Sequence, residues 1–220
     1  MVDFINKSLT MEEKILAHAQ KLLLCYGPKR VTMDDVCFGL GISKRTLYQY
    51  FPGKRELFHE SLKGYYGRLQ EDLDRIASKN ADPMERILKM YAYIFSVLNR
   101  HSAIVILDLK RQYPRSFNEF TQLKAHFIEH CTVPALNELL QAGYVQSQLK
   151  PLLLAQLFDH HIEALVNGVL PWRGQQDLIE YYEHMILFPL KGLLTSKGQQ
   201  SWEKTWAKHR EMAIESLKVP

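Results

Sequence analysis

The stretch TMDDVCFGLGISKRTLYQYF, residues 32–51, predicts two short helices joined by a tight turn. Gly41 lies at the turn, where glycine adopts a left-handed backbone at little cost. Ser43 is placed to cap the second helix. Apolar residues recur at the spacing that buries one side of each helix against the other, namely Val36, Leu40, Ile42 and Leu47. The stretch is therefore predicted to form a helix-turn-helix.

The second helix of this pair carries only positive charges. If Leu47 faces inward, Arg45 and Gln49 project to roughly the opposite side, because successive residues turn by about 100°. The outward side chains are of the kinds that bind phosphates and base edges: Lys44, Arg45, Thr46, Tyr48, Gln49 and Tyr50. This pattern predicts a helix that enters a nucleic-acid groove, with Ser43 at its amino end.

The positive charge of the chain is concentrated around this motif. The 220 residues carry a formal net charge of +4. Residues 1–70 hold 11 Lys and Arg against 7 Asp and Glu, whereas residues 71–220 hold 17 of each. We therefore expect one end of the protein to meet phosphates and the remainder to be electrically balanced.

Helical periodicity continues on both sides of the motif. A first helix is predicted from about Thr10 to Tyr26, with Thr10 and Glu13 in a capping-box pattern and Gly27 after its end. A long helix is predicted from Lys54 to about residue 77, followed by a domain boundary at residues 78–83.

The remainder is also predicted to be helical, over 84–99, 102–111, 117–142, 151–170 and 176–195. Ser116 is placed to cap the third of these helices, and Pro134 is expected to kink or split it. The last two are apolar around much of their circumference, so a second subunit is a natural cover for them. A further amphipathic helix, with Trp202 and Trp206 on its apolar stripe, is predicted within residues 198–220 and is expected to dock on the body or on a partner subunit.

The motif resembles the TetR/AcrR family of transcriptional regulators. The resemblance covers about residues 8–68 and rests on Gly41-Ile42-Ser43, Thr46-Leu47-Tyr48, Tyr50-Phe51, Lys54 and Glu56-Leu57. It departs from the family pattern at Cys37 and Leu40, where alanine is usual, and at Pro52-Gly53, where a polar residue and a serine-type cap are common.

The resemblance implies an all-α fold in which residues 8–68 form the DNA-binding domain and residues 69–197 form an effector-binding and dimerisation domain. It implies phosphate contacts from Thr32, Tyr50 and Lys54, and groove contacts from Lys44, Arg45, Thr46 and Tyr48. It further implies a homodimer whose last two core helices pair with their mates, a palindromic double-stranded DNA operator, and repression released by a small-molecule effector.

Effector contacts are expected from aromatic and polar residues within residues 83–195. The candidates are Tyr91, Phe95, Arg111, His126, His130, Phe158 and His161. No metal or other cofactor is predicted: His126 and His130 have ligand spacing, but a third ligand would be needed, and nothing in the spacing requires Asp159 or Cys131 to supply it.

Other classes of protein fit the sequence less well. Motifs for phosphate-binding loops, for serine hydrolases and for zinc hydrolases are absent, so an enzyme is not expected. No apolar run is long enough to span a membrane, no signal peptide is apparent, and the three cysteines are odd in number, so we expect a cytoplasmic protein. Two alternatives remain open: an effector-independent architectural DNA-binding protein, and a helical interaction module that does not bind DNA.

Overall fold

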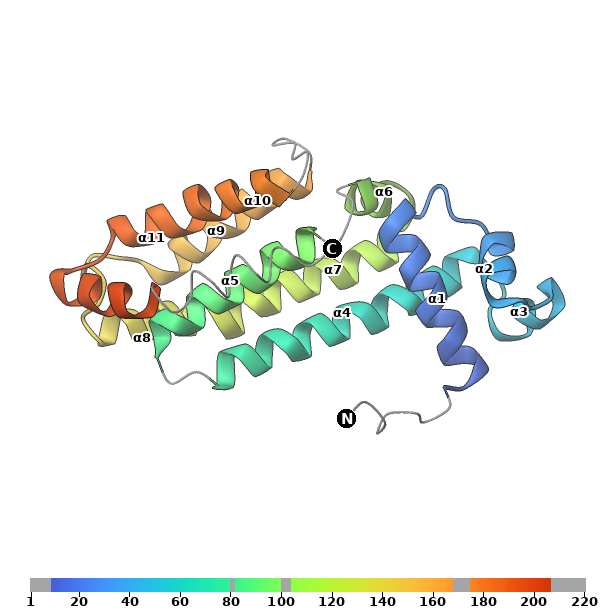
Figure 1. Ribbon diagram of the computed structural model, residues 1–220, viewed down its shortest axis with the longest axis horizontal. Coiled ribbons are helices and arrows are strands. Elements are labelled where there is room, and N and C mark those ends of the chain that lie inside the picture. The colour runs from blue at the N-terminus through green and yellow to red at the C-terminus, as the bar shows by residue number, and fades with distance from the viewer. Residues whose placement is uncertain (1–8, 80–81, 100–103, 168–174, 207–220) are drawn as a thin grey trace. The chain divides into compact units, whose positions relative to one another are not determined.

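The computed structural model describes residues 9–79, 82–99, 104–167 and 175–206, and these residues form helices joined by short connections (Figure 1). One isolated antiparallel bridge, between Val145 and Leu194, is the extent of β-pairing within those ranges. The predicted all-α class is confirmed.

Contacts divide the chain into two compact units, the first made of Met1–Gly67 with Ile104–Phe120 and the second of Arg68–Ala103 with Thr121–Pro220. The turn-forming residues predict a boundary at residues 78–83, and the family resemblance implies a division after residue 68. The structure instead returns a later segment to the first unit, since helix α6 (Ile104–Gln112) packs against helix α1 (Met11–Tyr26).

The first unit begins with three helices in the predicted order: α1, α2 (Met33–Leu40) and α3 (Lys44–Tyr50). Thr10 and Glu13 form the predicted capping box, and α1 ends at Gly27, whose φ is 80°. Thr32 caps α2 in the same manner, through Asp35. The core of the three helices consists of fully buried side chains, which include Ile15, Ala19, Leu23, Val36 and Leu47.

Helix α4 (Lys54–Lys79) follows the motif, and its first half adds Leu57, Phe58 and Leu62 to this core. Helix α7 (Pro114–His126) begins three residues earlier than predicted, because Pro114 is pre-shaped for a first helical turn. The prediction that Ser116 caps this helix is wrong. Ser116 is buried within the first turn, and its Oγ lies 3.4 Å from Nδ1 of His59.

The second unit is built from α5 (Pro83–Asn99), α8 (Val133–Gln141), α9 (Pro151–Val166), α10 (Gln175–Tyr182) and α11 (Phe188–Gly192). Helix α5 packs against both α8 and α10. Its packing to α10 is reinforced by Tyr182, which is fully buried and whose hydroxyl donates to the Leu88 carbonyl at 3.0 Å.

Two π-helical segments interrupt the helices of this unit, η1 (Phe127–Thr132) and η2 (Glu183–Leu187). Each stands immediately before a helix with proline in its first turn, Pro134 in α8 and Pro189 in α11. Proline cannot donate the usual backbone bond to the carbonyl four residues earlier, and a local change to wider π-type bonding accommodates that loss. The expected interruption at Pro134 therefore takes the form of a π-segment.

A last helix occupies residues 196–206 and packs onto the second unit. It begins earlier than residue 199, where its amphipathic pattern starts, because Thr195 provides a cap: Thr195 Oγ1 accepts from the Gly198 N–H at 3.1 Å. Trp202 is 4% exposed, and the Thr205 hydroxyl donates to Asp82 at 3.3 Å. The part of the predicted tail helix beyond residue 206 lies outside the described residues.

Candidate nucleic-acid interface

Helix α3 is held in place by its one buried side chain, Leu47, which is fully enclosed. Gly41 takes the left-handed conformation predicted for the turn, with φ 65°, and its N–H donates to the Phe38 carbonyl at 3.3 Å. Ser43 then caps α3, since its Oγ accepts from the Thr46 N–H at 3.0 Å. These local contacts orient the helix and leave its other sides open. The flanking side chains Leu40 and Ile42 are only half-buried.

The open sides of α3 carry most of the residues that the sequence selects for nucleic-acid contact. Arg45 and Gln49 are exposed, as are Tyr48 and Tyr50, at 50% and 42%. Thr46 is half-buried, with its Oγ1 only 2.9 Å from Ser43 Oγ. The structure thus brings the predicted groove-facing side chains together on one short helix.

Lys44 has a partner that sequence reasoning missed. Its Nζ lies 2.8 Å from Oδ1 of Asp34, with both side chains well exposed. The hydrogen bond and the charge of Asp34 raise the pKa of Lys44. Asp34 lies in the first turn of α2, where an acidic side chain is favoured by the helix dipole whether or not it has a partner. The pair with Lys44 therefore becomes evident only from the packing of α2 on α3.

The two flanking phosphate candidates differ in their surroundings. The exposed Thr32 hydroxyl donates to Oδ2 of Asp35 at 2.7 Å and accepts from the Asp35 N–H at 3.2 Å, so it already serves as a cap. Lys54 begins α4 and is partly buried, with its Nζ 5.3 Å from the centroid of the Phe58 ring. This burial lowers the pKa of Lys54.

Six of the seven effector candidates lie in the second unit. Tyr91, Phe95 and Phe158 are almost fully buried and pack as core: the ring centroids of Tyr91 and Phe158 are 5.3 Å apart. His161 is half-buried and its Nδ1 donates to the Met185 carbonyl at 3.1 Å.

The remaining candidates are not enclosed by this core. His126 lies beside Asp74, with its Nε2 2.7 Å from Oδ1, and His130 is exposed. Arg111 is exposed near the carboxyl end of α6, in the first unit. The expectation that Arg111 faces the core of the effector domain is therefore wrong, because α6 packs with the N-terminal helices.

The chain resembles known regulators most clearly across its N-terminal unit. The profile of the tetR family of bacterial regulatory proteins matches residues 15–61, which span α1 to the start of α4. The repressor KstR2 of Mycobacterium tuberculosis is 27% identical over 126 residues, which is 56% of this chain and 63% of that protein. The regulator EthR of Mycolicibacterium smegmatis is 32% identical over 93 residues, 42% of this chain and 43% of EthR. The chain thus spans less than two thirds of the length of these curated relatives.

Solved structures share the fold over a much larger part of the chain. A TetR-family regulator from Marinobacter aquaeolei VT8 covers 92% of this chain and 98% of its own, with a TM-score of 0.73 and 17% identity. The structure of the ketosteroid regulator KstR2 of M. tuberculosis covers 85% of this chain and 96% of its own, with a TM-score of 0.61 and 20% identity. These likenesses show a common architecture. Within the ranges described, no helix is both long enough and apolar enough to cross a bilayer. The chain therefore carries a helix-turn-helix that matches the tetR family of bacterial regulatory proteins over residues 15–61, and it shares its fold with a solved TetR-family regulator.

Proposed function

We propose that this protein is a dimeric, sequence-specific DNA-binding transcriptional regulator that represses its target genes until a small molecule releases it. The observation that carries the proposal is the polar outer face of α3, with exposed Arg45, Tyr48 and Gln49 on a helix anchored by Leu47 and capped by Ser43. A rigidly held helix with exposed donors is what direct readout of a major groove requires. The repressor and regulator names of KstR2 and EthR support the same role.

A pair of such helices would read a two-fold symmetric site. Support for pairing comes from the second unit, where α9 and α11 leave large apolar side chains exposed, namely Leu152, Leu153, Leu157 and Phe188. Apolar side chains gathered on neighbouring elements at 46–58% exposure are typical of an interface with another chain. In a dimer, the two α3 helices would bind half-sites about 34–36 Å apart, or a multiple of that distance.

We propose that the effector binds among the helices of the second unit, near Tyr91, Phe95, Phe158 and His161. Because these aromatic rings pack tightly against one another, a ligand must separate them in order to enter. Binding that favours the opened arrangement would shift the population away from the form that binds DNA.

The test is selection of bound fragments from random double-stranded DNA with the full-length protein, followed by footprinting. We expect enrichment of one palindrome, and release of the palindrome by at least one compound of a small-molecule library. Equal affinity for unrelated sequences would favour an architectural protein. Absence of salt-dependent DNA binding would favour a helical interaction module and overturn the proposal.

A further inference from the structure

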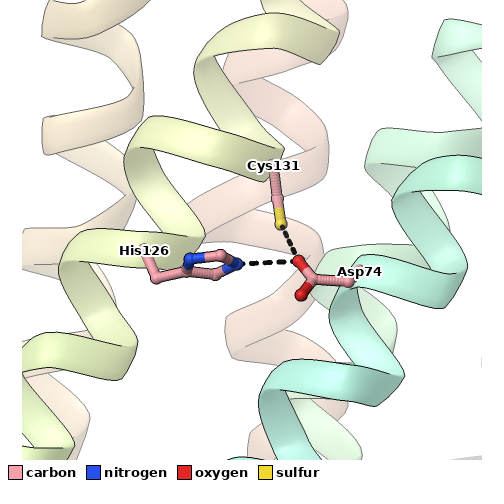
Figure 2. A group of neighbouring side chains, drawn as sticks. All are labelled: Asp74, His126 and Cys131. Carbon is pink, nitrogen blue, oxygen red and sulfur yellow. Dashed lines mark hydrogen bonds and ion pairs between the residues drawn. The ribbon is translucent and has the colours of Figure 1, made fainter.

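A carboxylate, an imidazole and a thiol converge in the second unit (Figure 2). Asp74 comes from α4, His126 ends α7, and Cys131 lies in η1. Oδ1 of Asp74 is 2.7 Å from His126 Nε2 and 3.7 Å from Cys131 Sγ. One potential ligand atom from each residue lies within 4.8 Å of the other two.

The π-helical segment explains how two residues five apart share one face. In a regular α-helix, a residue and the fifth after it point about 140° apart, since each turn takes 3.6 residues. In π-helix the backbone bonds join residues five apart, so these side chains stand above one another. Because η1 occupies Phe127–Thr132, His126 and Cys131 both point toward Asp74, as Figure 2 shows.

We propose that Asp74, His126 and Cys131 bind a divalent transition-metal ion of the Zn²⁺ class. Thiolate sulfur, imidazole nitrogen and carboxylate oxygen are the three protein ligands that Zn²⁺ accepts, at about 2.3, 2.0–2.1 and 2.0–2.2 Å. Those bond lengths in a tetrahedron separate the ligand atoms by about 3.3–3.6 Å. The separations of 2.7 Å from Asp74 to His126 and 3.7 Å from Asp74 to Cys131 are each within about 1 Å of these values, and the His126–Cys131 separation is no more than 4.8 Å.

The graded burial of the three side chains suits ion entry from solvent. Cys131 is 1% exposed, whereas the side chains of His126 and Asp74 are 24% and 46% exposed. An ion would therefore meet the carboxylate and the imidazole first. The fourth position is open to water or to the exposed His130, whose ring centroid is 4.7 Å from that of His126.

When the metal ion binds, it takes the place of the proton on the Cys131 thiol. Burial and the neighbouring charge of Asp74 raise the pKa of Cys131 to about 12, so without metal the thiol keeps its proton and donates to Asp74. Metal binding forms the metal–sulfur bond and releases the thiol proton to solvent. The proton on His126 Nε2, which now points to Asp74 Oδ1, moves to Nδ1 or to solvent so that Nε2 can bind the ion. The ion would thereby replace the hydrogen bonds that now join α4 to α7 and η1.

The test is titration of full-length protein, reduced and freed of metal with a chelator, with Co²⁺ and then Zn²⁺. We expect one Co²⁺ per chain, visible-region bands of tetrahedral Co²⁺, a near-ultraviolet band from thiolate-to-cobalt charge transfer, and loss of these bands on adding Zn²⁺. Cys131→Ser should abolish the charge-transfer band, and Asp74→Asn and His126→Gln should each weaken binding by about 10-fold or more.

Cys25→Ser is the matched control, because Cys25 is an exposed free cysteine of the first unit and its loss should leave every band intact. Circular dichroism establishes that each variant is folded. If Cys131→Ser does not fold, Asp74→Asn replaces it as the test variant, because the substitution is nearly isosteric and the Asp74 side chain is half exposed. The proposal is overturned if the wild-type protein gives no charge-transfer band, or if the band survives Cys131→Ser. The readout involves no DNA, so it stands or falls separately from the proposed regulator function.

Discussion

At the scale of single residues, Leu47 decides which side of α3 faces outward. It is the only buried residue of that helix, and its enclosure leaves Arg45 and Gln49 on the open side. The polar residues at the edges of the motif have structural roles as well, since Thr32 caps α2 and Lys44 pairs with Asp34. In the proposed DNA complex, the affinity that these two residues add would be the difference between their present hydrogen bonds and those to DNA.

Arg45 and Lys54 are expected to have different effects on DNA binding. Arg45→Ala should weaken operator binding by about 1–3 kcal/mol and relax sequence preference, since an exposed arginine on the reading helix is suited to base edges. Lys54→Ala should weaken binding to all sequences. It should also reduce the slope of log affinity against log salt concentration by about 1. Titrations by fluorescence anisotropy at several salt concentrations measure both. Lys21→Ala, which removes an exposed charge from α1, should have a smaller effect than either. Unchanged affinity in both test variants would refute their assignment to the interface.

Asp35 should make folding stability depend on acid pH. Hydrogen bonds from the Thr32 side chain and backbone N–H lower the pKa of Asp35 below its usual value. The ionised carboxylate therefore contributes stability that is fully present above the unfolded pKa of about 3.9. This contribution is lost as pH falls through the lower folded pKa.

The measurement is the difference in unfolding free energy between wild type and Asp35→Asn across pH. The wild type should be the more stable at neutral pH, and the difference should shrink in strong acid. Glu12→Gln is the control, because Glu12 also lies in a first helical turn but outside the capping box of α1. A difference that stays constant down to acid unfolding would contradict the assignment.

At the scale of elements, proline and glycine positions decide how the helices of the second unit meet. Pro134 and Pro189 follow the two π-segments, and η1 in turn sets the direction of Cys131. The helix of residues 196–206 depends on a close approach, since a Cβ on Gly198 would overlap the Tyr144 carbonyl. Its docking is completed by Lys197, whose Nζ donates to the Ala142 carbonyl at 2.8 Å.

Gly198→Ala should therefore destabilise the second unit. The added methyl group forces the helix of residues 196–206 away from the backbone at Tyr144, and overpacking of this kind costs about 1–3 kcal/mol. Thermal unfolding followed by circular dichroism measures the loss. Gly192→Ala is the matched control, because a Cβ at Gly192 meets nothing within 4 Å, and it should leave the melting temperature unchanged or slightly raised. Equal melting temperatures for the two variants would show that the close approach is unimportant.

At the scale of the whole molecule, the exposed leucines of α9 are the surface on which the proposed dimer rests. Leu152, Leu153 and Leu157 are about half exposed, and burying leucine side chains contributes about 1.5–3 kcal/mol each when complete. Pairing through this face would present two α3 helices to one DNA duplex, which increases affinity by linking two half-site contacts.

The double variant Leu153→Glu with Leu157→Glu is expected to be monomeric, since four carboxylates would face one another across a two-fold interface. Sedimentation velocity should show the lower mass, and affinity for a palindromic operator should fall while the circular dichroism spectrum is preserved. Leu9→Glu is the control, because Leu9 is similarly exposed but precedes α1, and it should remain dimeric. If the double variant is still dimeric, the interface does not lie on this face of α9.

The sequence by itself determined the helix-turn-helix and the helical class, because their signals are local. The capping residues Thr10 and Ser43 and the left-handed Gly41 each act within a few residues, so spacing alone predicts them. Only the tertiary structure decided which distant residues meet. It returned α6 and the exposed Arg111 to the first unit, and it brought Asp74 against His126 and Cys131 across more than 50 positions of sequence. Those outcomes depend on which apolar faces pack together and on the π-segment before Pro134. The periodicity of a single helix gives no information about either.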